Sequence, residues 1–105
     1  MTIQLNTDKN LTIHSEYENQ IVEQLTTGLA RFSDHISSLQ VHLSDENGSK
    51  DGKNDKKCVL EARLEGRSSV IGSTFDETYD LAITGALAKL KNALTTINGK
   101  LKEHH

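Results

Sequence analysis

The 105-residue chain has no tryptophan and no proline, and its aromatic residues are two tyrosines and two phenylalanines. Its core must therefore be aliphatic, and the length is sufficient for one domain with a modest core. The single cysteine cannot form an internal disulfide, and neither a signal-peptide pattern nor an apolar run of membrane-spanning length is present. These absences favour one domain over residues 1–105, in the cytoplasm and without a membrane partner.

Charge is distributed unevenly along the chain. The formal net charge of −3 argues against a protein that binds nucleic acid over its whole surface. Residues 1–55 hold four basic and nine acidic side chains, whereas residues 56–105 hold eight basic and six acidic ones. The eight basic residues of the second half are Lys56, Lys57, Arg63, Arg67, Lys89, Lys91, Lys100 and Lys102. Charge alone permits two interpretations, a solvated surface or a phosphate-binding one.

The segment 74–101 has the periodicity of a helix with one buried stripe. Its stripe consists of Ile83, Ala86, Leu87, Leu90, Leu94, Ile97 and Leu101. Thr74 followed by Glu77 has the form of a capping box, which predicts the helix start. Asn98-Gly99 is a plausible C-cap, which predicts that the turn through Lys102 frays or is separate.

Four lysines flank this stripe, and no acidic residue lies between Leu81 and Lys102. Lys89 and Lys100 are eleven residues apart, as are Lys91 and Lys102, and eleven residues make about three helical turns. Each pair should therefore point in one direction, which gives the helix two positive flanks.

Strand and helix patterns precede this segment. Ile3–Asn6 alternates as a short strand, and Ser15 with Glu18 resembles a second capping box that opens a helix. That helix has a stripe of Tyr17, Ile21, Leu25, Leu29 and Phe32, and we expect it to close at Ser33-Asp34.

Three further strands are expected at 39–44, 57–65 and 68–73, with a tight turn at Gly66. The polar segment Ser44–Asp55 lies between the first two of these strands, and we expect a flexible loop at 45–55. The order is strand, helix, three strands, helix. It predicts an α+β fold, β-α-β-β-β-α, with a four-stranded sheet and two helices packed on one face.

Catalytic and metal sites find little support in the residues. Cys58 is a possible nucleophile with His42 as its base, but the alternation of their strands places the two on opposite faces of the sheet. No histidine pair has the spacing of a zinc site, and the aspartates of the polar loop lack the EF-hand pattern. No glycine-rich phosphate loop follows a strand. We therefore expect no enzymatic activity, no cofactor and no metal.

Several motifs along the chain resemble one known family. The last helix carries them best, in Ile83-Thr84-Gly85, Lys89-Leu90, Leu94-Thr95 and Lys100–His104. Arg31-Phe32 with Asp34-His35-Ile36, residues 41–47, Asp55–Cys58 and Glu61–Leu64 add further matches. In this order they resemble the ribosome hibernation promoting factor / ribosome-associated inhibitor A family, also called sigma-54 modulation or S30AE-type proteins, in its short single-domain form.

The resemblance implies the same β-α-β-β-β-α fold and a factor that binds the small ribosomal subunit. Contacts with 16S rRNA in the mRNA/tRNA channel would inhibit translation or promote hibernation under stress. The resemblance implies RNA contacts by basic residues on the helices and sheet edge, and the eight named above are the candidates. We expect the pair Lys89 and Lys100 to matter most, because Lys89 lies in the best-matched part of the chain.

A second interpretation stays open. The first helix, at Glu23–Thr27, lacks the lysines that relatives place there. A family-fold protein that has lost ribosome binding and acts as a protein–protein interaction module is therefore the alternative. Such a protein would pair through a sheet edge, with itself or another chain. Neither interpretation calls for DNA, and both allow a monomer or a weak homodimer.

Overall fold

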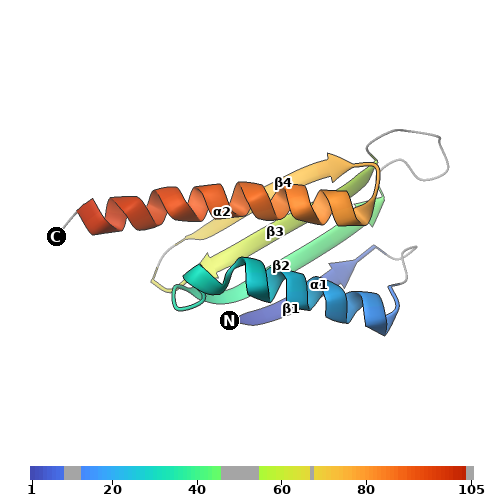
Figure 1. Cartoon of the computed structure of the whole chain (residues 1–105), viewed down its shortest axis with the longest axis horizontal. Coiled ribbons are helices and arrows are strands. Elements are labelled where there is room, and N and C mark those ends of the chain that lie inside the picture. The colour runs from blue at the N-terminus through green and yellow to red at the C-terminus, as the bar shows by residue number, and fades with distance from the viewer. Residues whose placement is uncertain (9–12, 46–54, 67, 104–105) are drawn as a thin grey trace.

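The computed structural model describes residues 1–8, 13–45, 55–66 and 68–103, with the backbone alone for residues 98–103. Two helices cover one face of a four-stranded sheet (Figure 1). In chain order the elements are β1 (Thr2–Thr7), α1 (Ser15–Gly28), the 3-10 turn η1 (Ala30–Phe32), β2 (Ile36–Asp45), β3 (Lys56–Leu64), β4 (Ser69–Asp76) and α2 (Tyr79–Glu103). The predicted α+β class and element order are confirmed.

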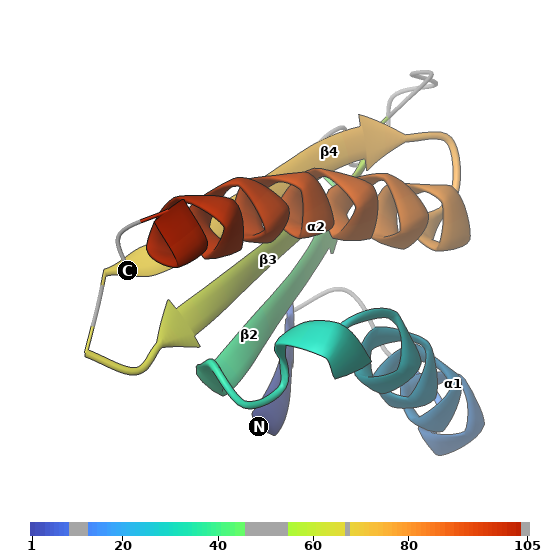
Figure 2. The same cartoon turned by 60° about the vertical axis from the view of Figure 1, so that its left-hand side comes forward.

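The sheet is mixed, with the strands in the order β1-β2-β3-β4. β1 runs parallel to β2, since α1 forms the crossover between them, whereas β2, β3 and β4 are mutually antiparallel. Both helices lie on the same side of the sheet (Figure 2), so the opposite face is open. We call the two sides of the sheet the helix face and the open face.

The core lies between the sheet and the helices, and alternation along the strands decides which residues enter it. Leu39, Val41 and Leu43 of β2 are buried on the helix face, as are Cys58 and Leu60 of β3. Ile21, Leu25 and Leu29 from the first helical segment and Ala82, Ile83, Ala86, Leu87, Leu90 and Leu94 of α2 pack against them. The two predicted stripes are thus confirmed over these residues.

The predicted start of the second helix is wrong. Thr74 pairs with Cys58, and Asp76 with Lys56, so both belong to β4 and not to a helix cap. The helix is capped by Thr78, whose Oγ1 accepts a hydrogen bond of 3.1 Å from the Leu81 N–H. Pairing with β3 therefore overrides the local capping signal and lengthens β4 beyond the predicted 68–73.

Two other predicted helix ends also differ from the structure. The residue before α1 is His14, and no side chain caps this helix start, so the predicted Ser15–Glu18 capping box is wrong. Helix α1 itself ends at Gly28, and η1 carries Phe32 into the core before the predicted stop at Ser33-Asp34. At the other end, α2 continues through Asn98-Gly99 to Glu103, so no C-cap forms there.

The predicted loop at 45–55 begins later than expected. Ser44 and Asp45 belong to β2, where they pair with Lys57 and Lys56, and residues 46–54 lie outside the described part of the chain. Gly66 has a φ of 68° in the turn after β3, as predicted for a tight turn that needs glycine. None of the described helices is long and apolar enough to cross a bilayer.

Helix α2 approaches β4 very closely at Gly72. A Cβ atom on this residue would lie 2.6 Å from the Ala86 carbonyl oxygen and 2.8 Å from the Leu90 nitrogen. Both are backbone atoms, so no side-chain rotation could relieve the contact. Glycine at this position lets the helix rest directly on the strand, which fixes where the lysines of α2 stand above the sheet.

Candidate nucleic-acid interface

Helix α2 places Lys89 and Lys91 on opposite flanks. Two residues along an α-helix turn by about 200°. Lys89 stands over β4, where its Nζ donates a hydrogen bond of 2.9 Å to the Ser73 carbonyl oxygen. Lys91 follows one turn after Leu87, the residue that packs against Gly28 of α1. We call these the β4 flank and the α1 flank of α2.

The two flanks differ in how their lysines are engaged. Lys89 is exposed but one of its N–H groups is held by Ser73. Lys91 is exposed, and its ammonium group has no hydrogen-bond or ion-pair partner within the part of the chain that the structure describes. The α1 flank therefore offers the more available cation to a phosphate.

Lys100 and Lys102 extend these flanks along the helix backbone. Helix α2 remains helical to Glu103, and its final turns project past the sheet (Figure 1). The side chains of residues 98–103 are outside the described set. The predicted alignment of Lys100 with Lys89, and of Lys102 with Lys91, therefore stays a prediction from helix geometry.

Lys56 faces the helix side of the sheet and is neutralised there. Its Nζ lies 2.9 Å from Asp45 Oδ2 and 3.3 Å from Asp55 Oδ1. The hydrogen bond to Asp45 raises the pKa of Lys56 above its ordinary value, and burial opposes this shift. Its ammonium also stands 5.9 Å from the centre of the Tyr79 ring. A phosphate at Lys56 would have to compete with two carboxylates.

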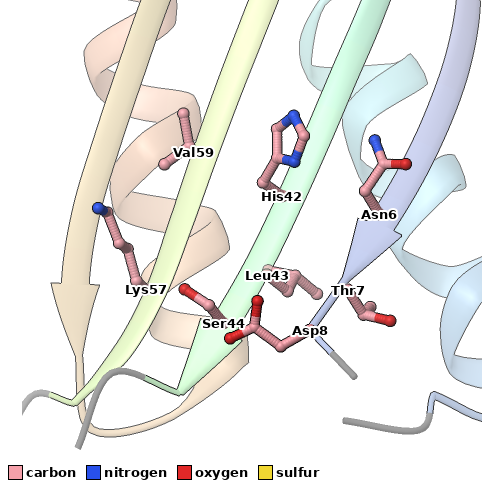
Figure 3. A pocket seen from close by; sticks show the side chains of 8 residues that line it. All are labelled: Asn6, Thr7, Asp8, His42, Leu43, Ser44, Lys57 and Val59. Atoms are coloured by element: carbon pink, nitrogen blue, oxygen red, sulfur yellow. The ribbon is translucent and has the colours of Figure 1, made fainter. Parts of the chain in front are cut away.

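Lys57 and Arg63 belong to the open face. Lys57 reaches over its cross-strand neighbour Phe75, with Nζ 5.2 Å from the ring centre. Figure 3 shows Lys57 with His42 and Val59 on this face, with the helices behind the strands. These side chains and Asn6, Thr7, Asp8, Leu43 and Ser44 line a pocket of about 200 Å³. Arg67 lies outside the described residues.

The basic residues predicted from the sequence therefore do not form one surface. Lys89 and Lys91 stand on the helix that covers one face of the sheet, whereas Lys57 and Arg63 project from the other face. A single RNA strand cannot contact both groups at once, because the sheet lies between them. Among the predicted candidates that the structure describes, the helix side offers Lys89 and Lys91 of α2, together with the ion-paired Lys56.

Acidic side chains limit this interface at one end. The N-termini of α1 and α2 lie at the same end of the molecule (Figure 1). Glu16, Glu18 and Asp80 lie in the first turns of these helices, and Glu23 is exposed farther along α1. Acidic residues at helix N-termini are favoured by the helix dipole. A polyanion should therefore approach the C-terminal halves of the helices.

A shallow groove lies between the two helices at Leu87, one helical turn before Lys91. It encloses about 500 Å³ and is lined by Gln20, Glu23, Gln24, Thr27, Gly28 and Leu87. Across it, the Gln24 side-chain amide donates a hydrogen bond of 3.3 Å to Thr84 Oγ1. Glu23 is the acidic residue of this groove, so it places a negative charge next to the α1 flank.

Cys58 is a core residue. Its side chain is fully buried, and burial raises the pKa of its thiol to about 12. His42 is exposed on the open face, on the opposite side of the sheet. The geometry thus excludes the Cys58–His42 pair. Within the described residues, no group of three or more His, Cys, Asp or Glu side chains could hold a metal ion.

Two features of the site were not anticipated from the sequence. Ile71 and Phe75 are 59% and 49% exposed on the edge strand β4. Phe75 lies in the segment that the sequence pattern assigns to the start of the second helix. Its position on the open face of the sheet was therefore not predicted. Tyr17 Oη donates a hydrogen bond of 2.6 Å to Asp80 Oδ1, which ties the N-terminal ends of the helices together. Burial and this bond raise the pKa of Tyr17.

Comparison with known proteins assigns the chain to a family. The family described as Sigma 54 modulation protein / S30EA ribosomal protein matches residues 6–102. The chain therefore belongs to this family, as its motifs suggested. Comparison with curated protein sequences gave no match.

Two solved structures share the fold. One is the N-terminal domain of Protein Y from Thermus thermophilus, with a TM-score of 0.71 and 22% identity over 92% of this chain and 99% of that one. The other is a ribosomal subunit interface protein from Coxiella burnetii, with a TM-score of 0.71 and 18% identity over 94% of this chain and 99% of that one. At these identities, the likeness establishes the fold.

Proposed function

We propose that this protein is a non-enzymatic factor that binds the small ribosomal subunit through its 16S rRNA and restrains translation when growth slows. The observation that carries the proposal is membership of the Sigma 54 modulation protein / S30EA ribosomal protein family over residues 6–102. The names of the two structural neighbours, a Protein Y domain and a ribosomal subunit interface protein, are consistent with it.

The C-terminal half of α2 is the RNA-contacting element in this proposal. Lysine contacts to phosphate give affinity without reading sequence, which suits binding by shape to folded rRNA. Lys91 supports the α1 flank, because its ammonium group is exposed and unpaired among the described residues. Lys89 is the weaker candidate, since a phosphate would have to replace its bond to Ser73. This reverses the order expected from sequence.

The remaining cations have lesser roles in the proposal. Lys56 supports the end of β3 through its ion pairs and contributes little to RNA binding. Lys57 and Arg63 serve as an internal comparison, because they carry the same charge on the face that the proposal leaves unused.

Co-sedimentation with purified 30S particles tests this function. The protein should pellet with the particles at low salt and be released progressively as the salt concentration rises, because each lysine–phosphate contact competes with counterions. Ribosomal particles stripped by high salt and the protein alone serve as controls. Protein that stays in the supernatant at both low and moderate salt would contradict the proposal and favour a protein–protein interaction module.

A further inference from the structure

The outer edge of β4 has no strand beside it in the described structure. β4 ends the sheet order, so one row of its backbone N–H and C=O groups points away from β3. In antiparallel pairing, alternate residues direct both groups to the same neighbour. Lys89 of α2 donates a hydrogen bond to the Ser73 carbonyl oxygen, so this oxygen points away from β3. Ile71 and Phe75 stand two residues to either side of Ser73, so their backbone groups belong to the same outward-facing row. Exposed edges of this kind pair readily with a second strand.

Two exposed apolar residues are placed symmetrically about Ser73 on this edge. Ile71 and Phe75 stand two residues on either side, and both are exposed on the open face. If a second copy adds its β4 antiparallel to the first, with a two-fold axis at Ser73, Ile71 of each copy lies opposite Phe75 of the other. Such cross-strand apolar pairs stabilise a sheet. The two pairs would shield from solvent the Ile71 and Phe75 side chains of both copies, the most exposed large apolar side chains among the described strand residues.

Charges on the open face also match under this symmetry. In the register of β3 and β4, Lys57 lies beside Phe75 and Glu61 lies beside Ile71. The two-fold axis therefore creates rows that read Lys57, Phe75, then Ile71 and Glu61 of the second copy. Each row carries opposite charges at its two ends, and the Lys57 ammonium already extends over Phe75 toward the edge. Complementary ends of this kind favour one register of association.

Lys89 is the group that opposes this pairing. Its bond to Ser73 occupies a carbonyl oxygen on the symmetry axis, which the second strand would need. Two copies would also bring two Lys89 ammonium groups together at that axis. One turn before and after Lys89 on α2 are the small residues Gly85 and Ala93. Lysine is one of the devices by which natural edge strands resist self-pairing.

We propose that the outer edge of β4 is a self-association surface for a second copy of this chain, and that Lys89 keeps it closed. The inference does not require ribosome binding, so it stands or fails separately from the proposed function. Loss of the Lys89–Ser73 bond allows two chains to join their sheets into one of eight strands. The symmetry closes the assembly at a dimer.

Sedimentation velocity over a range of protein concentrations, without ribosomes, tests the proposal. Lys89→Met keeps the length of the side chain but removes its charge and its donor. It should tighten dimerisation by at least about tenfold relative to the parent. Lys89→Arg keeps both properties and should behave as the parent does. Lys91→Met makes the same charge change on the other flank of α2 and is the matched control.

A second change locates the interface. Ile71→Lys in the Lys89→Met background adds an exposed charge beside the symmetry axis and should restore the monomer, while thermal melts confirm that each variant is folded. Amide exchange at Ile71, Ser73 and Phe75 should slow in the dimer. The proposal is overturned if Lys89→Met does not dimerise more tightly, if it forms larger species, if Lys91→Met has the same effect, or if the dimer survives Ile71→Lys.

Discussion

Lysine residues of equal formal charge differ in their capacity to bind phosphate in this protein, and their neighbours explain the difference. Lys56 is shared between Asp45 and Asp55. Lys89 is held by the Ser73 carbonyl oxygen, whereas Lys91 has no such partner among the described residues. Desolvating a cation and breaking its existing bonds both reduce what a new contact contributes. Charge counts along a sequence do not contain this information.

Cys58 should be unreactive in the folded protein. It is fully buried, and its thiol pKa is raised to about 12, so the thiolate that an alkylating reagent attacks is scarce near neutral pH. Iodoacetamide labelling followed by mass spectrometry should show slow modification in the native state and rapid modification in urea. Rapid labelling without denaturant would mean that Cys58 is accessible and that the core packing around it is wrong.

Gly72→Ala should destabilise the protein strongly. The added methyl group would meet the Ala86 carbonyl oxygen and the Leu90 nitrogen at less than contact distance, so α2 must move away from β4. Overpacking of this kind costs about 2–3 kcal/mol. Urea unfolding measures the loss, and Ser73→Ala on the neighbouring position should stay within about 0.5 kcal/mol of the parent. Equal stability of Gly72→Ala and the parent would contradict the close contact.

At the scale of elements, periodicity predicted each helix and strand but not all of their ends. Apolar residues alternate along β2 and β3 and recur every three to four residues in α1 and α2, because these positions face one core. The start of α2 was misplaced because Thr74 and Thr78 both precede acidic residues and can both cap a helix. Only pairing of Thr74 with Cys58, a long-range contact, decides between them.

The candidate interface was predictable only in part, for the same reason. Helical spacing correctly separates Lys89 from Lys91. It cannot show that Lys89 reaches a carbonyl group sixteen residues earlier in the chain, or that Lys56 faces the helices while Lys57 faces away. These facts depend on the register of β4 and on the distance between α2 and the sheet.

In the proposed complex, Glu23 of α1 should weaken ribosome binding, because it places a negative charge in the groove that Leu87 of α2 lines. Glu23→Lys should therefore tighten binding to 30S particles and steepen the dependence of affinity on salt by about one unit of slope, corresponding to one added phosphate contact. Binding titrations at several salt concentrations measure both quantities. Glu61→Lys makes the same charge change on the open face and should alter the slope much less. An equal response to both changes would indicate a nonspecific charge effect.

At the scale of the whole molecule, the sheet divides the protein into two chemically different surfaces. The helix side carries the lysines of α2 and becomes acidic toward the N-terminal ends of both helices. The open side carries exposed Ile71 and Phe75 together with charges of both signs. We propose that the first surface binds rRNA and that the edge of the second mediates self-association, so substitutions can separate the two activities.

The salt dependence of the affinity for 30S particles tests whether the α1 flank of α2 contacts rRNA, as we propose. Lys91→Gln with Lys102→Gln should weaken binding at low salt and reduce the slope of log affinity against log salt by about 1–2 units. Lys57→Gln with Arg63→Gln removes two charges from the open face and should leave the slope close to that of the parent. An unchanged slope for the α2 pair, with a reduced slope for the open-face pair, would contradict the account and place the RNA on the other side of the sheet.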